Sequence, residues 1–299
     1  MQINTITTDS VENELTSQKK IRLDILRLDK IHPVVSGNKW FKLQHYIPDA
    51  AEKGFHTLLT FGGAYSNHIA ATAYAAKEFG VKAIGIIRGE EPRQWSHTLQ
   101  EAATLGMQLI FLPRKEFALV KRNASPENFQ KQFGKVYPIP EGGYGILGMQ
   151  GAAEILATSD TRSYTHIISA VGTGTTIAGI IQAAGAHQQV IGISAMKHNF
   201  GLNNEIQSLL NKPLPGTFCI IHDYHFGGYA KHTSALTNFM NTFYRATNIP
   251  LDFVYTAKMM YGIFDLIREN FFPPHSRILA IHSGGLQGNP SLTPGVLVF

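Results

Sequence analysis

Short apolar runs alternate with amphipathic stretches along most of this chain, and the alternation predicts its secondary structure. The apolar runs are bounded by glycine or polar residues, as buried strands are, whereas the stretches between them place apolar side chains at helical spacing. Strands are predicted over residues 21–27, 57–61, 82–87, 108–112, 136–140, 166–171, 190–194 and 277–281. One helix is predicted to begin at residue 39, and a separate helix, after the strand 57–61, is predicted to end at residue 79. Further helices are predicted over residues 96–105, 114–135, 147–157, 177–184 and 255–268. Strands separated by helices imply parallel sheets, so we expect two packed α/β domains with a cleft between them.

Composition narrows the class of protein. The chain has 299 residues, of which 44% are hydrophobic and 16% charged, a balance typical of a compact α/β enzyme. Its formal net charge is +5, but lysine and arginine are scattered, so we expect no nucleic-acid partner. The single cysteine, Cys219, lies in an apolar run, which predicts a buried, unreactive thiol and excludes an internal disulfide. With no secretory leader and no apolar stretch long enough to cross a membrane, we expect a soluble cytoplasmic protein.

The stretch around Lys39 is the first candidate for chemistry. A turn of small residues at 36–38 leads into an amphipathic helix that begins at this lysine. The positive end of the helix dipole disfavours an ammonium there, so the amine should lose its proton easily and attack an aldehyde more readily. Lys42 is predicted to lie on the polar side of the same helix. On this stretch alone, a solvated surface lysine remains the alternative.

The junction after the strand 57–61 predicts a carboxylate site. Two glycines are followed by Ser66, Asn67 and His68 at the start of a helix. Backbone N–H groups, a hydroxyl and a carboxamide at a helix N-terminus suit a carboxylate. An ordinary N-cap by Ser66 or Asn67 is the structural alternative.

The junction after the strand 166–171 predicts a phosphate site, because residues 171–176 present amides and hydroxyls at another helix start. The third glycine of a dinucleotide fingerprint is replaced by Ile177, and the strand 190–194 ends without an acidic residue for a ribose. The lysine of a P-loop is also missing, since Ile180 stands in its place. A compact monophosphate fits what remains, with a plain tight turn as the alternative.

Two further positions complete a chemical set. Ser283 follows the predicted strand 277–281, and Tyr255 starts the helix 255–268. Taken singly, either side chain is as well explained by packing. An amine, a monophosphate site, a carboxylate site and a hydroxyl for a ring nitrogen are together what pyridoxal 5'-phosphate and an amino-acid substrate need.

On these motifs, which run in the same order, the chain resembles the 1-aminocyclopropane-1-carboxylate deaminase / D-cysteine desulfhydrase family of fold-type-II pyridoxal-phosphate enzymes. The resemblance implies two open, twisted parallel-sheet domains, a large cofactor-binding one of residues 1–41 and 155–299 and a small one of residues 42–154, with the active site between them. It also implies a homodimer that acts on a small amino acid. The implied cofactor contacts are Lys39, Asn67, Gly172, Thr173, Gly174, Thr175, Thr176 and Ser283. The implied substrate contacts are Ser66, Asn67, His68, Tyr229 and Tyr255, and the implied catalytic residues are Lys39, Tyr255 and Ser66.

Three positions separate the branches of this family. The deaminase branch has a glutamate after the active-site tyrosine and a glutamine after the Ser-Asn pair, where this chain has Thr256 and His68. A hydroxyl at the ring-nitrogen position, here Ser283, belongs to the desulfhydrase branch. Such a hydroxyl leaves the ring a weaker electron sink, which suits expulsion of a thiolate better than opening of a cyclopropane. We therefore predict β-elimination of D-cysteine to pyruvate, ammonia and hydrogen sulfide, with Lys39 or Tyr255 moving the Cα proton.

Two other functions stay open at this point. One is 1-aminocyclopropane-1-carboxylate deaminase, and the other is a non-catalytic protein that binds pyridoxal phosphate or an amino acid. The presence of Lys39 argues against the second, because a pure binder needs no imine-forming amine. The loop that contains His222, Asp223 and His225 carries the side chains of metal ligands, but we assign no metal site to it.

Overall fold

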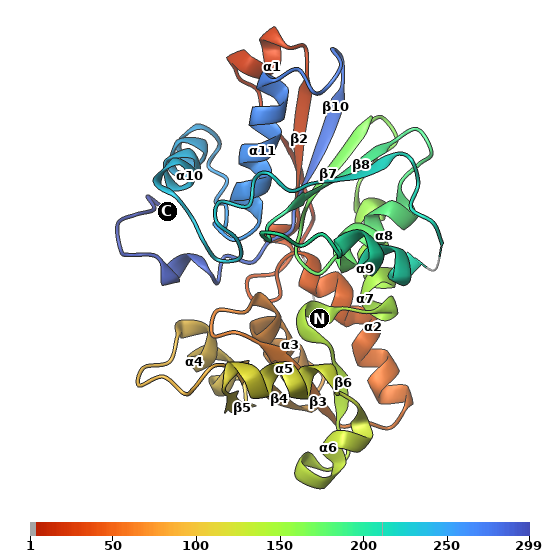
Figure 1. Cartoon of the computed structure of the whole chain (residues 1–299), viewed down its shortest axis with the longest axis vertical. Helices are drawn as coiled ribbons and strands as arrows, with labels where there is room; N and C mark the ends of the chain where they lie inside the picture. The colour runs from red at the N-terminus through yellow and green to blue at the C-terminus, as the bar shows by residue number, and fades with distance from the viewer. Residues whose placement is uncertain (1–3, 211) are drawn as a thin grey trace.

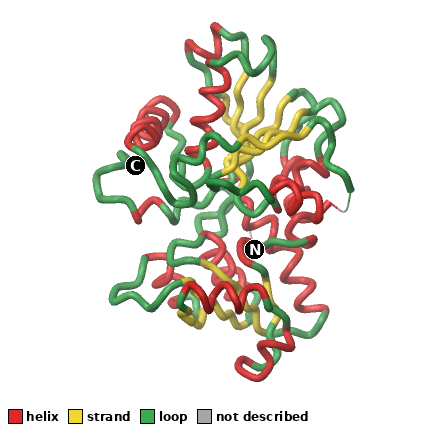
Figure 2. The backbone as a smooth tube through the Cα atoms, viewed as in Figure 1, coloured by secondary structure: helices red, strands yellow, loops and turns green. Residues whose placement is uncertain are grey.

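The computed structural model describes residues 4–210 and 212–299. Two separate sheets, one in each half of the molecule, are flanked by helices (Figure 1). Figure 2 shows the strands of the larger sheet gathered in the upper half and those of the smaller sheet in the lower half. The sequence pattern of alternating strands and helices is therefore confirmed as an α/β fold. No helix among the described residues is long and apolar enough to span a membrane.

The larger sheet has six strands, and each neighbouring pair is parallel except the first. In sheet order they are β1 (Thr8–Ser10), β2 (Arg22–Arg27), β10 (Arg277–His282), β7 (His166–Val171), β8 (Gln189–Ser194) and β9 (Phe218–Ile221). Alternate residues of each inner strand enter different cores, because successive side chains of a strand point to opposite faces. Ile278 and Ala280 pack with one set of helices and Leu279 and Ile281 with the other. The first set includes α10 (Ser234–Thr247) and α11 (Thr256–Arg268), next to the short α1 (Glu14–Gln18), and the second includes α7 (Ile146–Ala153), α8 (Thr175–Ala183) and α9 (Leu202–Leu210).

The smaller sheet has four parallel strands. In sheet order they are β5 (Met107–Leu112), β4 (Lys82–Arg88), β3 (Thr57–Gly62) and β6 (Tyr137–Ile139). Leu58 packs on the side of α3 (Asn67–Glu78) and α4 (His97–Thr104). Its neighbour Leu59 packs on the side of α5 (Arg114–Arg122) and α6 (Pro126–Phe133). Both sheets are thus covered on both faces, so the carboxyl ends of their strands are where a ligand can enter.

Helix α2 (Asn38–Glu52) joins the two halves. Phe41 packs into the core beside the larger sheet, whereas Leu43 and Tyr46 pack into the core of the smaller sheet. A helix that belongs to both cores gives no sharp break in the chain. The boundaries at residues 41/42 and 154/155 therefore stay a prediction.

Several elements differ from the sequence prediction. The stretch 114–135 forms two helices instead of one, because Ser125 caps a new helix with its side chain and Pro126 occupies the first turn. The helix expected to reach residue 157 ends at Ala153 and continues as a 3₁₀ segment, Glu154–Thr158. The sequence prediction missed β1, α1, α9, β9 and α10, and β1 adds an antiparallel edge to a sheet expected to be parallel.

Candidate active site

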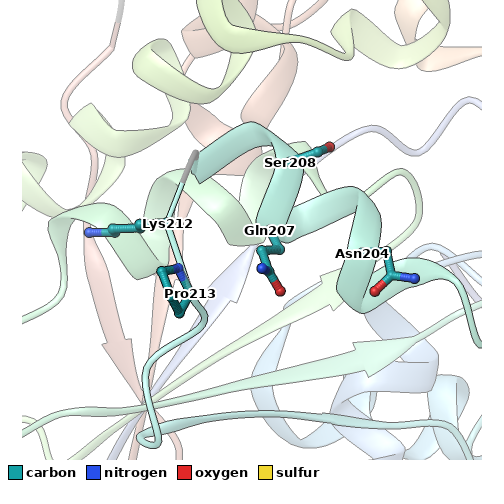
Figure 3. Close-up of a pocket in the computed structure, with 5 residues that line it drawn as sticks. All are labelled: Asn204, Gln207, Ser208, Lys212 and Pro213. Carbon is teal, nitrogen blue, oxygen red and sulfur yellow. The ribbon is translucent and has the colours of Figure 1, made fainter.

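A cavity of about 850 Å³ lies between the two sheets, at the carboxyl ends of their strands. It is lined by every residue that the sequence singled out for the site except Thr175. That threonine is fully buried directly behind the wall, with its hydroxyl 3.3 Å from that of Thr173. A second, open hollow on the surface of α9 is lined by Asn204, Gln207, Ser208, Lys212 and Pro213, and contains none of the predicted residues (Figure 3). The fold therefore brings the predicted site residues together in one place.

The turn before Lys39 is held against the loop after β10. The backbone N–H of Asn38 donates to the carbonyl of Ser283 at 3.0 Å, and the N–H of Gly285 donates to the Ser36 hydroxyl at 2.9 Å. A Cβ at Gly37 would lie 1.7 Å from the Ser283 carbonyl oxygen, so only glycine permits this approach. The contact fixes the predicted amine beside the predicted ring-nitrogen hydroxyl.

The amine of Lys39 has an altered acidity. Burial lowers the pKa of Lys39 to about 8, and the carboxylate of Asp252 opposes part of that shift. The main cause is thus desolvation and not the helix dipole that the sequence pattern indicates. Its Nζ donates to the Oδ1 of Asn38 at 3.3 Å, and the Nδ2 of Asn38 donates to the Thr176 hydroxyl at 2.7 Å. A polar chain therefore connects the amine to the predicted phosphate loop.

The phosphate loop is shaped as a cup at the N-terminus of α8. Gly174 has a left-handed backbone with φ of 82°, and no side chain caps the helix there, so its first amides have no side-chain partner. Free amides at a helix start, with the positive end of the helix dipole behind them, are suited to a phosphate. The ring of Tyr255 crosses the mouth of this loop, since a Cβ at Gly172 would lie 3.0 Å from it.

Tyr255 and Tyr229 form one wall of the cavity. Their rings lie edge to face with centroids 6.1 Å apart. Burial raises the pKa of both phenols, and that of Tyr255 lies well above its ordinary value. Both side chains are therefore neutral phenols at physiological pH and are able to donate a proton.

Asp252 fixes the start of α11 and hence Tyr255. Its buried carboxylate accepts hydrogen bonds from the backbone N–H groups of Val254, Tyr255 and Thr256, all at 2.9 Å, and from the Thr256 hydroxyl at 2.8 Å. Thr256, at the position that distinguishes the family branches, is thus fully buried and bonded to Asp252. Burial raises the pKa of Asp252, while these donors act to lower it.

The loop after β3 supplies the opposite wall. Ser66 caps α3, accepting from the N–H groups of His68 and Ile69 at 3.2 and 3.3 Å. The structural alternative is thereby confirmed for Ser66, although the hydroxyl keeps its own proton to donate. The Nδ2 of Asn67 donates to the carbonyl of Gly285 at 3.2 Å, and its Oδ1 is buried with no partner. A Cβ at Gly285 would lie 2.4 Å from Nδ2, so the close approach of Asn67 also depends on a glycine.

The hydrogen bonds around His68 determine its tautomer. The Thr60 hydroxyl donates its one proton to the carbonyl of Ile139 at 2.9 Å, so it must accept from Nε2 of His68, which lies 2.9 Å away. Burial holds the pKa of His68 well below its ordinary value. The imidazole is therefore neutral, protonated on Nε2, and its Nδ1 is a buried acceptor without a partner. An acceptor nitrogen does not suit a carboxylate.

Lys42, Arg88 and Asp252 are among the cavity residues that the sequence analysis missed. Lys42 was expected on the polar side of α2, but it is only 2% exposed, and its Nζ donates to the carbonyl of Gly142 at 3.1 Å. Burial, with Lys39 nearby, holds the pKa of Lys42 well below its ordinary value. Its spacing of three residues from Lys39 puts both on one helix face and could have revealed it. Arg88 is the last residue of β4, and its guanidinium lies 5.9 Å from the centre of the Tyr229 ring. Asp252, described above, also lines the cavity.

Two further expectations concern residues outside the cavity. Cys219 is half-buried on β9 and burial raises the pKa of its thiol, so the thiol is not activated. Over the described ranges, no three His, Cys, Asp or Glu side chains lie close enough to hold a metal ion, and this includes the loop around His222.

The cavity fits a phosphorylated aromatic aldehyde. Gly172 and Gly285 carry no Cβ, so the ring of Tyr255 and the carboxamide of Asn67 come close to the backbone at these two positions. The amides at the start of α8 provide for a phosphate, and a neutral amine is accessible at Lys39 because of its lowered pKa. The last two features suit the phosphate and the aldehyde of pyridoxal phosphate.

Comparison with known proteins agrees with this chemistry. Residues 13–284 match the model of a family described as "Pyridoxal-phosphate dependent enzyme". A protein of Pyrococcus horikoshii named for an inferred 1-aminocyclopropane-1-carboxylate deaminase activity is 30% identical over 267 residues, covering 85% of this chain and 81% of that protein. The "Bifunctional D-cysteine desulfhydrase/1-aminocyclopropane-1-carboxylate deaminase, mitochondrial" of Arabidopsis thaliana is 30% identical over 286 residues, covering 85% of this chain and 70% of that protein. A crystal structure described as a homologue of the same deaminase superposes with a TM-score of 0.83 at 27% identity, covering 96% of this chain and 91% of that one.

Proposed function

The chain belongs to the family of pyridoxal-phosphate-dependent enzymes, and from this premise we propose that it removes the β substituent and the amino group of a small amino acid, with D-cysteine as substrate. The hydroxyl at the ring-nitrogen position carries the proposal. Ser283 lies in the loop after β10, against the turn before the amine of Lys39. Thr256 stands where the family resemblance implies a glutamate in the ring-opening branch. The nearby carboxylate of Asp252 is occupied by four donors around α11.

The cofactor defines which residues act. When bound, pyridoxal phosphate supplies an aldehyde carbon that an amine attacks and a ring that takes up the electron pair released when the Cα–H bond breaks. We assign the covalent attachment to Lys39 and the phosphate to the amides of α8 with the hydroxyls of Thr173 and Thr176. Lys42 helps to position the phosphate loop. Its Nζ donates to the carbonyl of Gly142, and this glycine lies against Thr173, since a Cβ on it would be 3.5 Å from the threonine side chain.

The substrate carboxylate is assigned to Ser66 and Asn67. The Ser66 hydroxyl retains its proton, and Asn67 Nδ2 has a second N–H that Gly285 does not use. We leave the imidazole of His68 out of this contact, because its free nitrogen is an acceptor. The Nδ1 of His68 is suited to accept a hydrogen bond from a donor and not to bind an anion.

The proton at Cα is assigned to Lys39 and not to Tyr255. With a pKa of about 8, roughly a tenth of Lys39 amines are free at pH 7, which makes the lysine a workable base. The raised pKa of Tyr255 keeps its phenol protonated, so it is suited to donate toward the departing thiolate.

A visible absorption spectrum with D-cysteine titration tests the function directly. The purified protein should show the band of lysine-bound cofactor, and D-cysteine should yield sulfide and pyruvate in equal amounts while L-cysteine serves as the control. Formation of 2-oxobutanoate from 1-aminocyclopropane-1-carboxylate would assign the chain to the ring-opening activity that several relatives are named for. A protein that stays colourless with added cofactor would support the non-catalytic binder.

The assembly and location implied by the resemblance also remain proposals. We propose a homodimer in the cytoplasm. Size-exclusion chromatography with light scattering distinguishes a dimer from a monomer of 33.0 kDa.

A further inference from the structure

A buried lysine lies outside the cavity, and the proposed chemistry does not use it. Lys258 is on α11 and is fully buried. Its Nζ donates to the carbonyl of Gly228 at 2.7 Å and to that of Ala195 at 3.4 Å. No carboxylate of the described chain is within ion-pair distance of it. A methionine would fill this space without the desolvation cost of an amine.

The two carbonyls belong to two separate walls of the cavity. Ala195 follows β8 and precedes residues 196–199, all of which line the cavity. Gly228 immediately precedes Tyr229. The two segments also touch each other, since a Cβ at Gly228, where φ is 117°, would lie 3.4 Å from the Cβ of Lys197.

Lys258 lies on α11, the helix that begins next to Tyr255, a third part of the cavity wall. Lys258 follows Tyr255 by three residues, so both lie on one side at the start of α11, whose first turn Asp252 fixes. One amine therefore connects 196–199 and Tyr229 to the element that positions Tyr255. Breaking its two hydrogen bonds would free these segments relative to Tyr255 while leaving the phosphate loop and Lys39 in place.

We propose that Lys258 is a positioning residue that sets the spacing of Tyr229 from Tyr255 and thereby the shape of the substrate end of the cavity. The inference rests on the proposed function, in which Tyr255 acts on the amino acid, and on the substrate contact that the family resemblance implies for Tyr229. Lys258 itself touches neither substrate nor cofactor. Its loss should therefore affect amino-acid binding more than cofactor binding.

A double-mutant cycle separates positioning from general stability. In K258M, which removes the donors and keeps the length, KM for the amino acid should rise about tenfold with cofactor content unchanged. In the Y229A background, the same substitution should change KM by less than about twofold, because the residue it acts through is gone. Equal fold-changes in both backgrounds would overturn the proposal. K258Q, which keeps an amide donor, should give a KM between those of wild type and K258M.

Hydrogen exchange tests the same inference without turnover. Amides of residues 196–199 and 225–231 should exchange faster in K258M than in wild type. The control is I267A, which removes core packing from the far end of α11 and should lower stability without selectively speeding these amides. Unchanged exchange in K258M overturns the positioning role. If the wild-type protein shows no turnover of D-cysteine but exchange is altered in K258M, the result counts only against the proposed function.

Discussion

The contact between the turn before Lys39 and the loop after β10 can be tested with two glycines that share one backbone conformation. Gly37 has φ 68° and ψ −149°, and Gly134 has φ 71° and ψ −153°. Replacing either by alanine puts an L residue in a region that nearly only glycine occupies. That strain costs about 1–3 kcal/mol at each site.

The two positions differ in what the new methyl group meets. At Gly134 no atom lies within 4 Å, whereas at Gly37 the Cβ would lie 1.7 Å from the Ser283 carbonyl oxygen. Since real Cβ contacts are essentially never under 3.0 Å, the two loops must separate by more than 1 Å. The hydrogen bond from Asn38 to Ser283, now 3.0 Å long, is then lost. Leaving that pair unsatisfied adds about 1–3 kcal/mol, so G37A should destabilise the protein by that much more than G134A.

Urea unfolding of both variants without cofactor measures the difference, and cofactor titration measures its effect on the site. We expect G37A to bind pyridoxal phosphate more weakly than wild type, because Lys39 and Ser283 move apart. G134A should bind it as wild type does. Equal losses of stability in the two variants, or unchanged cofactor binding in G37A, would refute the argument that this close approach assembles the site.

The remaining predictions concern single side chains. K39A should lose the visible band of lysine-bound cofactor and at least about 10²-fold in turnover, measured with the substrate that wild type accepts. The rate of cofactor attachment to cofactor-free protein should rise with pH and level off above about 8 instead of near 10.4, because burial lowers the pKa of Lys39. Burial lowers the pKa of Lys258 to about 8, so between about pH 8 and 10 the unfolded chain binds more protons than the folded one and the free energy of unfolding should rise with pH. Urea titrations at several pH values should show that K258M removes up to about 2 kcal/mol of that rise. T60V should destabilise the protein by about 1–3 kcal/mol through the lost bonds to His68 and Ile139, whereas T72V, at a buried hydroxyl without a partner, should be nearly neutral.

The strands of this fold could be predicted from the sequence because they are buried on both faces. In the runs 166–171 and 277–282 four of six residues are apolar and nearly every position is buried, as expected for strands covered on both faces. The elements that were missed have weaker local patterns. β1 has three residues and exists through its pairing with β2, while α10 is rich in threonine and asparagine, which are poor helix formers. Tertiary contacts stabilise such elements, and a single stretch does not show them.

The site divides in the same way. Residues at strand ends, such as Ser66, Gly172 and Ser283, could be predicted because parallel strands present their carboxyl ends at one edge. The burial of Lys42 depends on how its helix meets the loop around Gly142, so the local pattern placed Lys42 on the wrong side of α2. The tautomer of His68 likewise follows from Thr60 and β6, which no spacing in the sequence connects to it.

The position of β10 has a consequence for how the protein is made. This strand is the last of the chain, yet it lies in the middle of the larger sheet, between β2 and β7. During synthesis β2 and β7 therefore lack their shared neighbour until residues 277–282 have left the ribosome. The same insertion brings residue 283 against residue 37. Closure of the sheet and completion of the active site are thus one folding event, and a chain truncated before β10 would lose both together.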